Sequence, residues 1–179
     1  MQPLPDAARE LLETLAAPPR LVAHLRLVHD VAWQVTGWLA DEHPRLGFDR
    51  EAVLFGAATH DIGKVRHPRE LSQPGRQHEP AGYELLLELG VPDRLARFAG
   101  THGSWTADGV EVEDLLVSLA DKVWKGQRVA ELEQLVVDRL AAASGLEAWA
   151  AFLSLDDRLQ VVAGAADARL AYQNGFPVL

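Results

Sequence analysis

The sequence predicts an all-α protein, a single-domain helical bundle of about eight or nine helices. Apolar residues recur every three or four positions along most of the chain, which places them on one face of a helix. No segment shows the strict apolar–polar alternation of a half-buried strand. With 179 residues, of which 48% are hydrophobic, the chain is long enough to bury a sizeable core.

The first half of the chain contains three predicted helices. The first covers residues 5–17 and is stopped by a pair of prolines, which cannot continue a helix. The second covers residues 20–42, where leucine and valine recur at helical spacing. The third begins after Asp49, a preferred N-cap residue, and runs to Asp61 or Ile62.

The second half begins with a predicted loop and continues as helices. Residues 64–77 hold two prolines and a glycine, and we expect a long loop there. The remaining helices are predicted over residues 78–90, 93–101, 113–124, 128–143, 146–155 and 156–173. Glycine follows the last of these, as is common at helix ends.

Composition excludes several classes of function. The net charge of -9 argues against broad binding to nucleic acid or to anionic membranes, because both require clustered cations. The N-terminus lacks the basic and apolar regions of a signal peptide, and no apolar run approaches the roughly 18 residues of a membrane span. The absence of cysteine fits a reducing compartment. We therefore expect a cytoplasmic protein without a nucleic-acid or membrane partner.

Four metal-ligating side chains stand on predicted apolar helix faces: His24, His60, Asp61 and Asp121. A buried charge needs a compensating partner, and one partner shared by the three segments that carry these residues would be a divalent metal. Adjacent helix residues diverge by about 100°, so His60 and Asp61 reach one ion only near the end of their helix. Imidazoles and carboxylates suit Mg²⁺, Mn²⁺, Fe²⁺ or Zn²⁺.

These residues, in this order, resemble the HD-domain metal-dependent phosphohydrolase superfamily. The matching stretches are HLRLVHDVA, AATHDIGK and SLADKV. The resemblance covers about residues 20–130, the metal-binding core of the single domain 1–179. Residues 131–179 then form a C-terminal helical extension that either covers the core or forms a homodimer surface. A second pair, His29-Asp30, lacks the following Ile-Gly-Lys and is expected to face solvent.

The resemblance implies which residues hold metal. One ion would be held by His24, His60, Asp61 and Asp121. Asp61 would bridge to a second ion held by His78 and His102. Many relatives carry a double histidine at the last place, where this chain has His102-Gly103. One or two divalent ions are expected, with iron or manganese favoured over magnesium or zinc.

Cations in the loop after the His-Asp pair indicate an anionic substrate. Substrate-binding roles are predicted for Lys64, Arg66, Arg69 and Arg76. Long loops that carry such groups are often functional, and relatives use the lysine of HDIGK near substrate oxygens. A second, weaker phosphate contact is predicted at Lys122, Lys125 and Arg128. We also expect Glu79 to position a ligand histidine.

The predicted function is hydrolysis of a phosphate ester or anhydride of a small, phosphate-containing anion, with a nucleotide as the expected substrate. Metal ions would activate water and template the displacement. The predicted catalytic residues are Asp61, which positions that water, and Lys64, which neutralises charge on phosphoryl oxygens. Two alternatives remain open at this point. One is a di-iron oxygenase of the same superfamily, and the other is a non-catalytic nucleotide-binding module.

Overall fold

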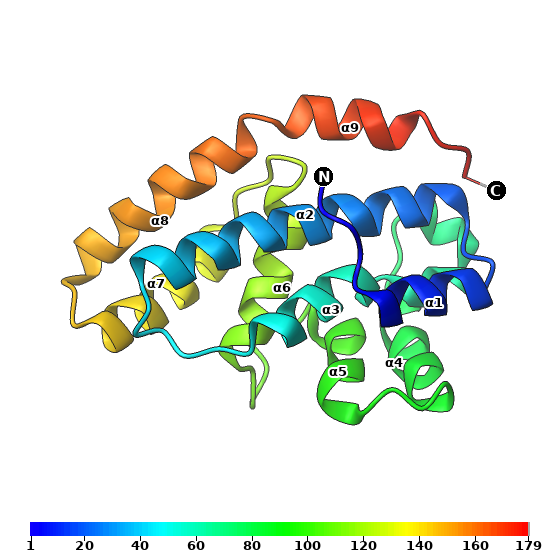
Figure 1. Cartoon of the computed structure of the whole chain (residues 1–179), viewed down its shortest axis with the longest axis horizontal. Coiled ribbons are helices and arrows are strands. Elements are labelled where there is room, and N and C mark those ends of the chain that lie inside the picture. The colour runs from blue at the N-terminus through cyan, green and yellow to red at the C-terminus, as the bar shows by residue number, and fades with distance from the viewer. Residues whose placement is uncertain (179) are drawn as a thin grey trace.

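Nine α-helices and two short 3-10 helices make up residues 1–178, the part of the chain described by the computed structural model (Figure 1). The α-helices are α1 (Asp6–Thr14), α2 (Pro19–Glu42), α3 (Arg50–Thr59), α4 (His78–Glu88), α5 (Asp93–Thr101), α6 (Val112–Val123), α7 (Ala130–Ser144), α8 (Ala148–Ala163) and α9 (Ala166–Asn174). The 3-10 helices are η1 (Ile62–Val65) and η2 (Pro68–Leu71). No strand occurs in these residues, which confirms the predicted all-α bundle.

Helix α2 runs through the middle of the bundle and packs against α3 and α6 (Figure 1). Helices α8 and α9 lie along the outside of α2, at the top of the view. Because α2 is covered from more than one direction, its buried surface is wider than a single stripe. His29 is therefore buried at 1% exposure, and the prediction that it faces solvent was wrong.

Several predicted boundaries were also wrong. Helix α3 ends at Thr59, so His60 is its C-cap residue and Asp61 begins the turn into η1. The segment predicted as a long loop, residues 64–77, includes the end of η1 and all of η2. Helix α8 continues without a break past Asp156, which sequence reading took as the start of a new helix. The Asp156 carboxylate instead accepts hydrogen bonds from Arg128 and from Gln160 one turn later.

Two apolar clusters form the core. The larger one joins α2, α3, α6, α7 and α8, and the smaller one joins α1, α4 and α5 to the beginning of α2. Helix α3 contributes to both and crosses close to α5 and α6 at Gly56, where a Cβ would lie 2.6 Å from Phe98. This close crossing fixes the position of His60, one turn further along α3.

The C-terminal helices are tied to the bundle by a buried arginine. The Arg169 Nε of α9 donates to the Trp124 carbonyl oxygen at 2.6 Å, and the same guanidinium donates to the Val162 carbonyl. At the other end of α9, the Arg20 guanidinium donates to the Asn174 side chain at 2.7 Å. None of the helices in residues 1–178 combines the length and apolar character needed to cross a bilayer.

Candidate metal centre

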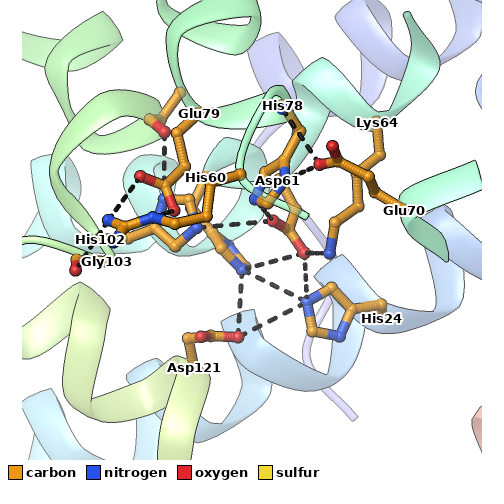
Figure 2. Close-up of polar contacts among 12 residues, drawn as sticks. His24, His60, Asp61, Lys64, Glu70, His78, Glu79, His102, Gly103 and Asp121 are labelled. Atoms are coloured by element: carbon orange, nitrogen blue, oxygen red, sulfur yellow. Dashed lines mark hydrogen bonds and ion pairs between the residues drawn. The ribbon is translucent and has the colours of Figure 1, made fainter. Parts of the chain in front are cut away.

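Six buried side chains from five helices converge on one place (Figure 2). They are His24 of α2, His60 and Asp61 at the end of α3, His78 at the start of α4, His102 at the end of α5, and Asp121 of α6. The structure thus brings together every residue predicted to hold metal. Their ligand atoms form two groups, each within 4.8 Å of one another: His24, His60 and Asp121, then Asp61, His78 and His102.

The first group has the spacing of ligands around one ion. His24 Nε2 lies 3.3 Å from His60 Nε2 and 3.7 Å from Asp121 Oδ1. His60 Nε2 lies 3.4 Å from the same Asp121 oxygen. Bonds of about 2.1 Å to a central ion place neighbouring ligand atoms roughly 3 to 3.5 Å apart. One divalent ion therefore fits among these three side chains.

Asp61 divides its two carboxylate oxygens between the groups. Oδ2 lies 3.0 Å from His24 Nε2 and 3.7 Å from His60 Nε2. Oδ1 lies 3.0 Å from His78 Nε2 and 3.6 Å from His102 Nε2. Figure 2 shows the carboxylate between the two sets of rings. One oxygen of the Asp61 carboxylate therefore faces each group.

Three of the four histidines have their Nδ1 atoms fixed by an acceptor. His60 Nδ1 donates to the Ala57 carbonyl at 3.1 Å, and His102 Nδ1 donates to the Ala99 carbonyl at 3.1 Å. His78 Nδ1 lies 2.5 Å from Glu70 Oε2. Because a carbonyl oxygen can only accept, His60 and His102 each carry a proton on Nδ1, and a neutral ring of this tautomer leaves a lone pair on Nε2.

These lone pairs provide the test of whether the residues fit a metal. They point at one another and at carboxylate oxygens, an arrangement that is repulsive unless a positive charge lies between them. Histidines anchored through one ring nitrogen, with the other nitrogen free to coordinate, are typical of metal sites. The donor set of imidazoles and carboxylates without thiolate suits a divalent ion. The residues therefore fit the metal.

The pKa directions of His24, His102 and Asp61 agree with this interpretation. Burial lowers the pKa of His24, and it lowers that of His102 to about 4, so both rings are neutral near pH 7. Burial lowers the pKa of His78 as well, but its contacts with Asp61 and Glu70 outweigh burial and raise it. Burial alone would raise the pKa of Asp61, but attraction from His60 and Lys64 holds it well below its usual range. Neutral imidazoles and ionised carboxylates are the states that coordinate metal.

A comparison with known families decides what this arrangement is. A family model described as HD domain matches residues 32–124, which is more than half of the chain. The chain belongs to the HD-domain family. The resemblance inferred from the sequence is thereby confirmed. The matched segment begins after His24, so it is the geometry that joins this histidine to the site.

An uncharacterized protein of Methanocaldococcus jannaschii is 26% identical to this chain over 146 residues. The match covers 73% of this chain and 81% of that protein. No solved structure matches the chain. HD domains bind divalent metals and are generally metal-dependent phosphohydrolases, which agrees with the two groups of ligands found here.

Lysines, rather than the predicted arginines, face the centre of this HD domain. Lys64 Nζ lies 2.5 Å from Asp61 Oδ2, and Lys122 Nζ lies 2.6 Å from Asp121 Oδ2. The other predicted substrate-binding residues do not line the cavity above the metal groups: Arg66 pairs with Glu88, Arg69 is exposed, Arg76 pairs with Glu79, and Arg128 pairs with Glu133 and Asp156.

Glu70 orients His78, a candidate ligand, which is the role that the sequence had predicted for Glu79. Its carboxylate accepts from His78 Nδ1, and it also accepts from the backbone N–H of His78 at 3.2 Å and of Gln77 at 3.1 Å. Glu70 therefore both caps α4 and orients the ring of His78, the first residue of that helix. Glu79 instead accepts from Arg76 at 3.0 Å. The sequence offered one indication of this role, namely that Glu70 is an acidic residue shortly before the helix that begins with His78.

Two glycines leave room for this arrangement. A Cβ on Gly75 would lie 2.3 Å from Glu70 Oε1, so only glycine lets the loop pass the carboxylate. A Cβ on Gly103 would lie 2.8 Å from Glu79 Oε1. The Arg76–Glu79 ion pair thus fills the space beside Gly103.

A cavity of about 310 Å³ opens above the metal groups. Its floor includes His24, Asp61 and Asp121, and three lysines line it as well: Lys64, Lys122 and Lys125. Lys125 makes no ion pair with any residue in 1–178. Gln173 of α9 also lines the cavity, and nothing in the sequence pattern had indicated it.

Proposed function

We propose that the protein is a metal-dependent phosphohydrolase that cleaves a phosphate ester or anhydride of a small anion, with a nucleotide as the expected substrate. One observation carries the proposal: Asp61 presents one carboxylate oxygen to each of two buried histidine groups at the floor of a cavity. The general chemistry of HD domains supports it.

Metal ions in these groups would polarise a phosphoryl oxygen and lower the pKa of a water molecule placed between them and the substrate. Asp61 orients that water, because its oxygens face both groups. Lys64, held against Asp61, places a positive charge beside the oxygens of the phosphoryl group. The side chains are buried, which strengthens these electrostatic contacts relative to water.

The charge distribution of the cavity favours a small anion. Lys64 and Lys122 are each paired with a carboxylate, whereas Lys125 has no such partner within residues 1–178 and remains able to contact an anion. The chain as a whole carries a net charge of -9, which repels long polyanions. The cavity volume lies at the low end of the range for small-molecule sites, about 300–1,000 Å³.

The test uses protein stripped of metal by a chelator and then reloaded with Mn²⁺ or Fe²⁺. We expect the reloaded protein to release phosphate from a nucleotide or to cleave bis(p-nitrophenyl) phosphate. The Asp61→Asn variant should lose at least about 100-fold of this activity. Asp41→Asn is the matched control, because Asp41 is exposed and does not line the cavity.

Two outcomes would overturn the proposal. Oxygen consumption coupled to substrate loss, without phosphate release, would assign the site to the oxygenase alternative. Tight nucleotide binding that survives Asp61→Asn, with no turnover of any substrate, would assign the chain to the non-catalytic binding module.

A further inference from the structure

The cavity has one wall that comes from outside the matched HD segment. Gln173, near the end of α9, lines the cavity together with Trp124 and the lysines. The family match ends at residue 124, so α9 lies outside the matched segment. A polar side chain from outside that segment, placed at the site, is a candidate for substrate recognition.

Helix α9 is held firmly enough to present a side chain in a fixed place. Arg169 is buried and donates to the carbonyl of Trp124, the residue whose indole contacts the His24 ring at a centroid distance of 5.0 Å. At the start of α9, Ala166 approaches Gly126, whose added Cβ would lie 3.1 Å from the Ala166 Cβ. Helix α9 is therefore anchored to the turn that follows the Asp121 helix.

The end of α9 is anchored as well. The Arg20 guanidinium donates to Asn174 Oδ1, and the Arg20 backbone N–H donates to the Pro177 carbonyl at 3.2 Å. Arg20 lies four residues before His24 on α2. Gln173 thus lies between two anchored positions of α9, Arg169 and Asn174. Their partners are Trp124, which contacts His24, and Arg20, which precedes His24 on α2.

The Gln173 carboxamide itself is unused. Its side chain makes no hydrogen bond to any residue in 1–178, although it is half-buried and faces the cavity. A carboxamide offers two N–H donors and one acceptor oxygen and carries no charge. It therefore matches a neutral hydrogen-bonding group better than a phosphate, for which the lysines of the same cavity are the better partners.

We propose that Gln173 is a specificity-determining residue that hydrogen-bonds the neutral part of the substrate next to its phosphate. This inference rests on the proposed function, because it assigns another part of the same cavity. The chemistry required is a hydroxyl or amide-like edge attached to a phosphate. A ribose hydroxyl and a nucleobase edge both supply it, and the two can be separated by experiment.

The experiment measures binding rather than turnover, using the full chain loaded with Mn²⁺ and calorimetric titration. The probes are the non-hydrolysable phosphonate analogues of adenosine 5′-monophosphate and of ribose 5-phosphate, with methylphosphonate as the reference. We expect Gln173→Ala to weaken the adenosine probe about 3- to 10-fold more than methylphosphonate, the effect of one lost hydrogen bond. The matched control is Gln127→Ala, an exposed glutamine that does not line the cavity.

A comparison of the two larger probes identifies the neutral group that Gln173 contacts. An equal selective loss for the ribose probe assigns Gln173 to a sugar hydroxyl, and a loss confined to the adenosine probe assigns it to the base. An unchanged ratio of affinities in Gln173→Ala overturns the inference even if the protein hydrolyses phosphate esters. A changed ratio in a protein that hydrolyses nothing supports recognition by Gln173 and overturns the proposed function instead.

Discussion

The two histidine groups of the metal centre are held in place by different kinds of structure. His24 and Asp121 of the first group stand inside regular α-helices, whose other residues are packed in the core. His78 of the second group is the first residue of α4, at the end of a segment built from two 3-10 helices and a glycine-containing turn. Regular packing positions the first group, whereas irregular backbone positions His78 of the second, although His102 stands at the end of the regular helix α5.

The N-terminal caps of α3, which carries His60, and of α4, which carries His78, show the same difference. Asp49 caps α3 in the ordinary way, with its side chain accepting from the Ala52 N–H three residues later at 3.0 Å. Helix α4 is capped by Glu70, seven and eight residues before the N–H groups that it accepts from. The second group should therefore be more easily lost, because fewer regular contacts support it.

The largest expected effect comes from Gly63, where η1 packs against α4. A Cβ there would lie 2.0 Å from the His78 carbonyl oxygen and 2.5 Å from the Gly82 nitrogen, both of them backbone atoms. Gly63→Ala must displace α4, at a cost of more than about 3 kcal/mol in unfolding free energy. Metal analysis should show that the ion of the second group is lost.

The control for this variant is Gly47→Ala, since an added Cβ at Gly47 meets nothing within 4 Å. Its unfolding free energy should stay within about 0.5 kcal/mol of the wild-type value. Full metal content in Gly63→Ala would show that the second group tolerates movement of α4, and the two groups would then not differ in how firmly they are held.

Features that depend on local sequence were predictable, and features that depend on the path of loops or on tertiary packing were not. The all-α fold and the Asp49 cap were readable because helical periodicity and capping are local signals, and both are confirmed. Four candidate ligands were singled out from their places on apolar helix faces, and His78 and His102 from the resemblance. The structure brings all six together. Glu70 was missed because its contact with His78 depends on the path of the loop. Gln173 was missed because only the tertiary fold brings α9 to the cavity.

The next largest effect is expected at His29 of α2, the regular helix that carries His24. His29 lies on α2, five residues beyond His24, and burial lowers its pKa to about 4, only partly offset by Asp30. Its Nδ1 is buried without a hydrogen-bond partner. In the unfolded chain the pKa of histidine is about 6.5, so the unfolded state gains the proton first as the pH falls. Stability from neutral His29 is complete above pH 6.5 and is lost progressively towards pH 4.

The unfolding free energy lost on protonation of His29 amounts to at most about 3 kcal/mol. Chemical denaturation of metal-free wild type and His29→Gln between pH 7 and pH 4 checks it, because the difference between the two curves cancels the other histidines. The difference should shrink as the pH falls. A difference that does not change with pH would show that His29 accepts a proton without cost, contrary to its burial.

A smaller effect, about 10- to 100-fold in the affinity for one ion, is expected from Glu70→Gln. The glutamine keeps the size of the side chain but removes the charge that orients His78 Nδ1 and caps α4. Titration of metal-free protein with Mn²⁺ should show one weakened site and one unchanged site. Glu79→Gln is the matched control, since Glu79 pairs with Arg76 and contacts no ligand histidine. Equal weakening in both variants would remove the role assigned to Glu70.

The smallest effect is expected at the local cap of α3, the helix that carries His60. Asp49→Ala removes the acceptor for the Ala52 N–H and should cost about 1 kcal/mol in unfolding free energy. Metal affinity should change little, because His60 is also fixed by its bond to Ala57 and by the close crossing of α3 with its neighbours. Asp41→Ala, an exposed change without a side-chain hydrogen bond in residues 1–178, is the control for stability. If Asp49→Ala weakened metal binding as much as Glu70→Gln, caps would matter equally for both groups. The difference between regular and irregular support would then lie elsewhere in the structure.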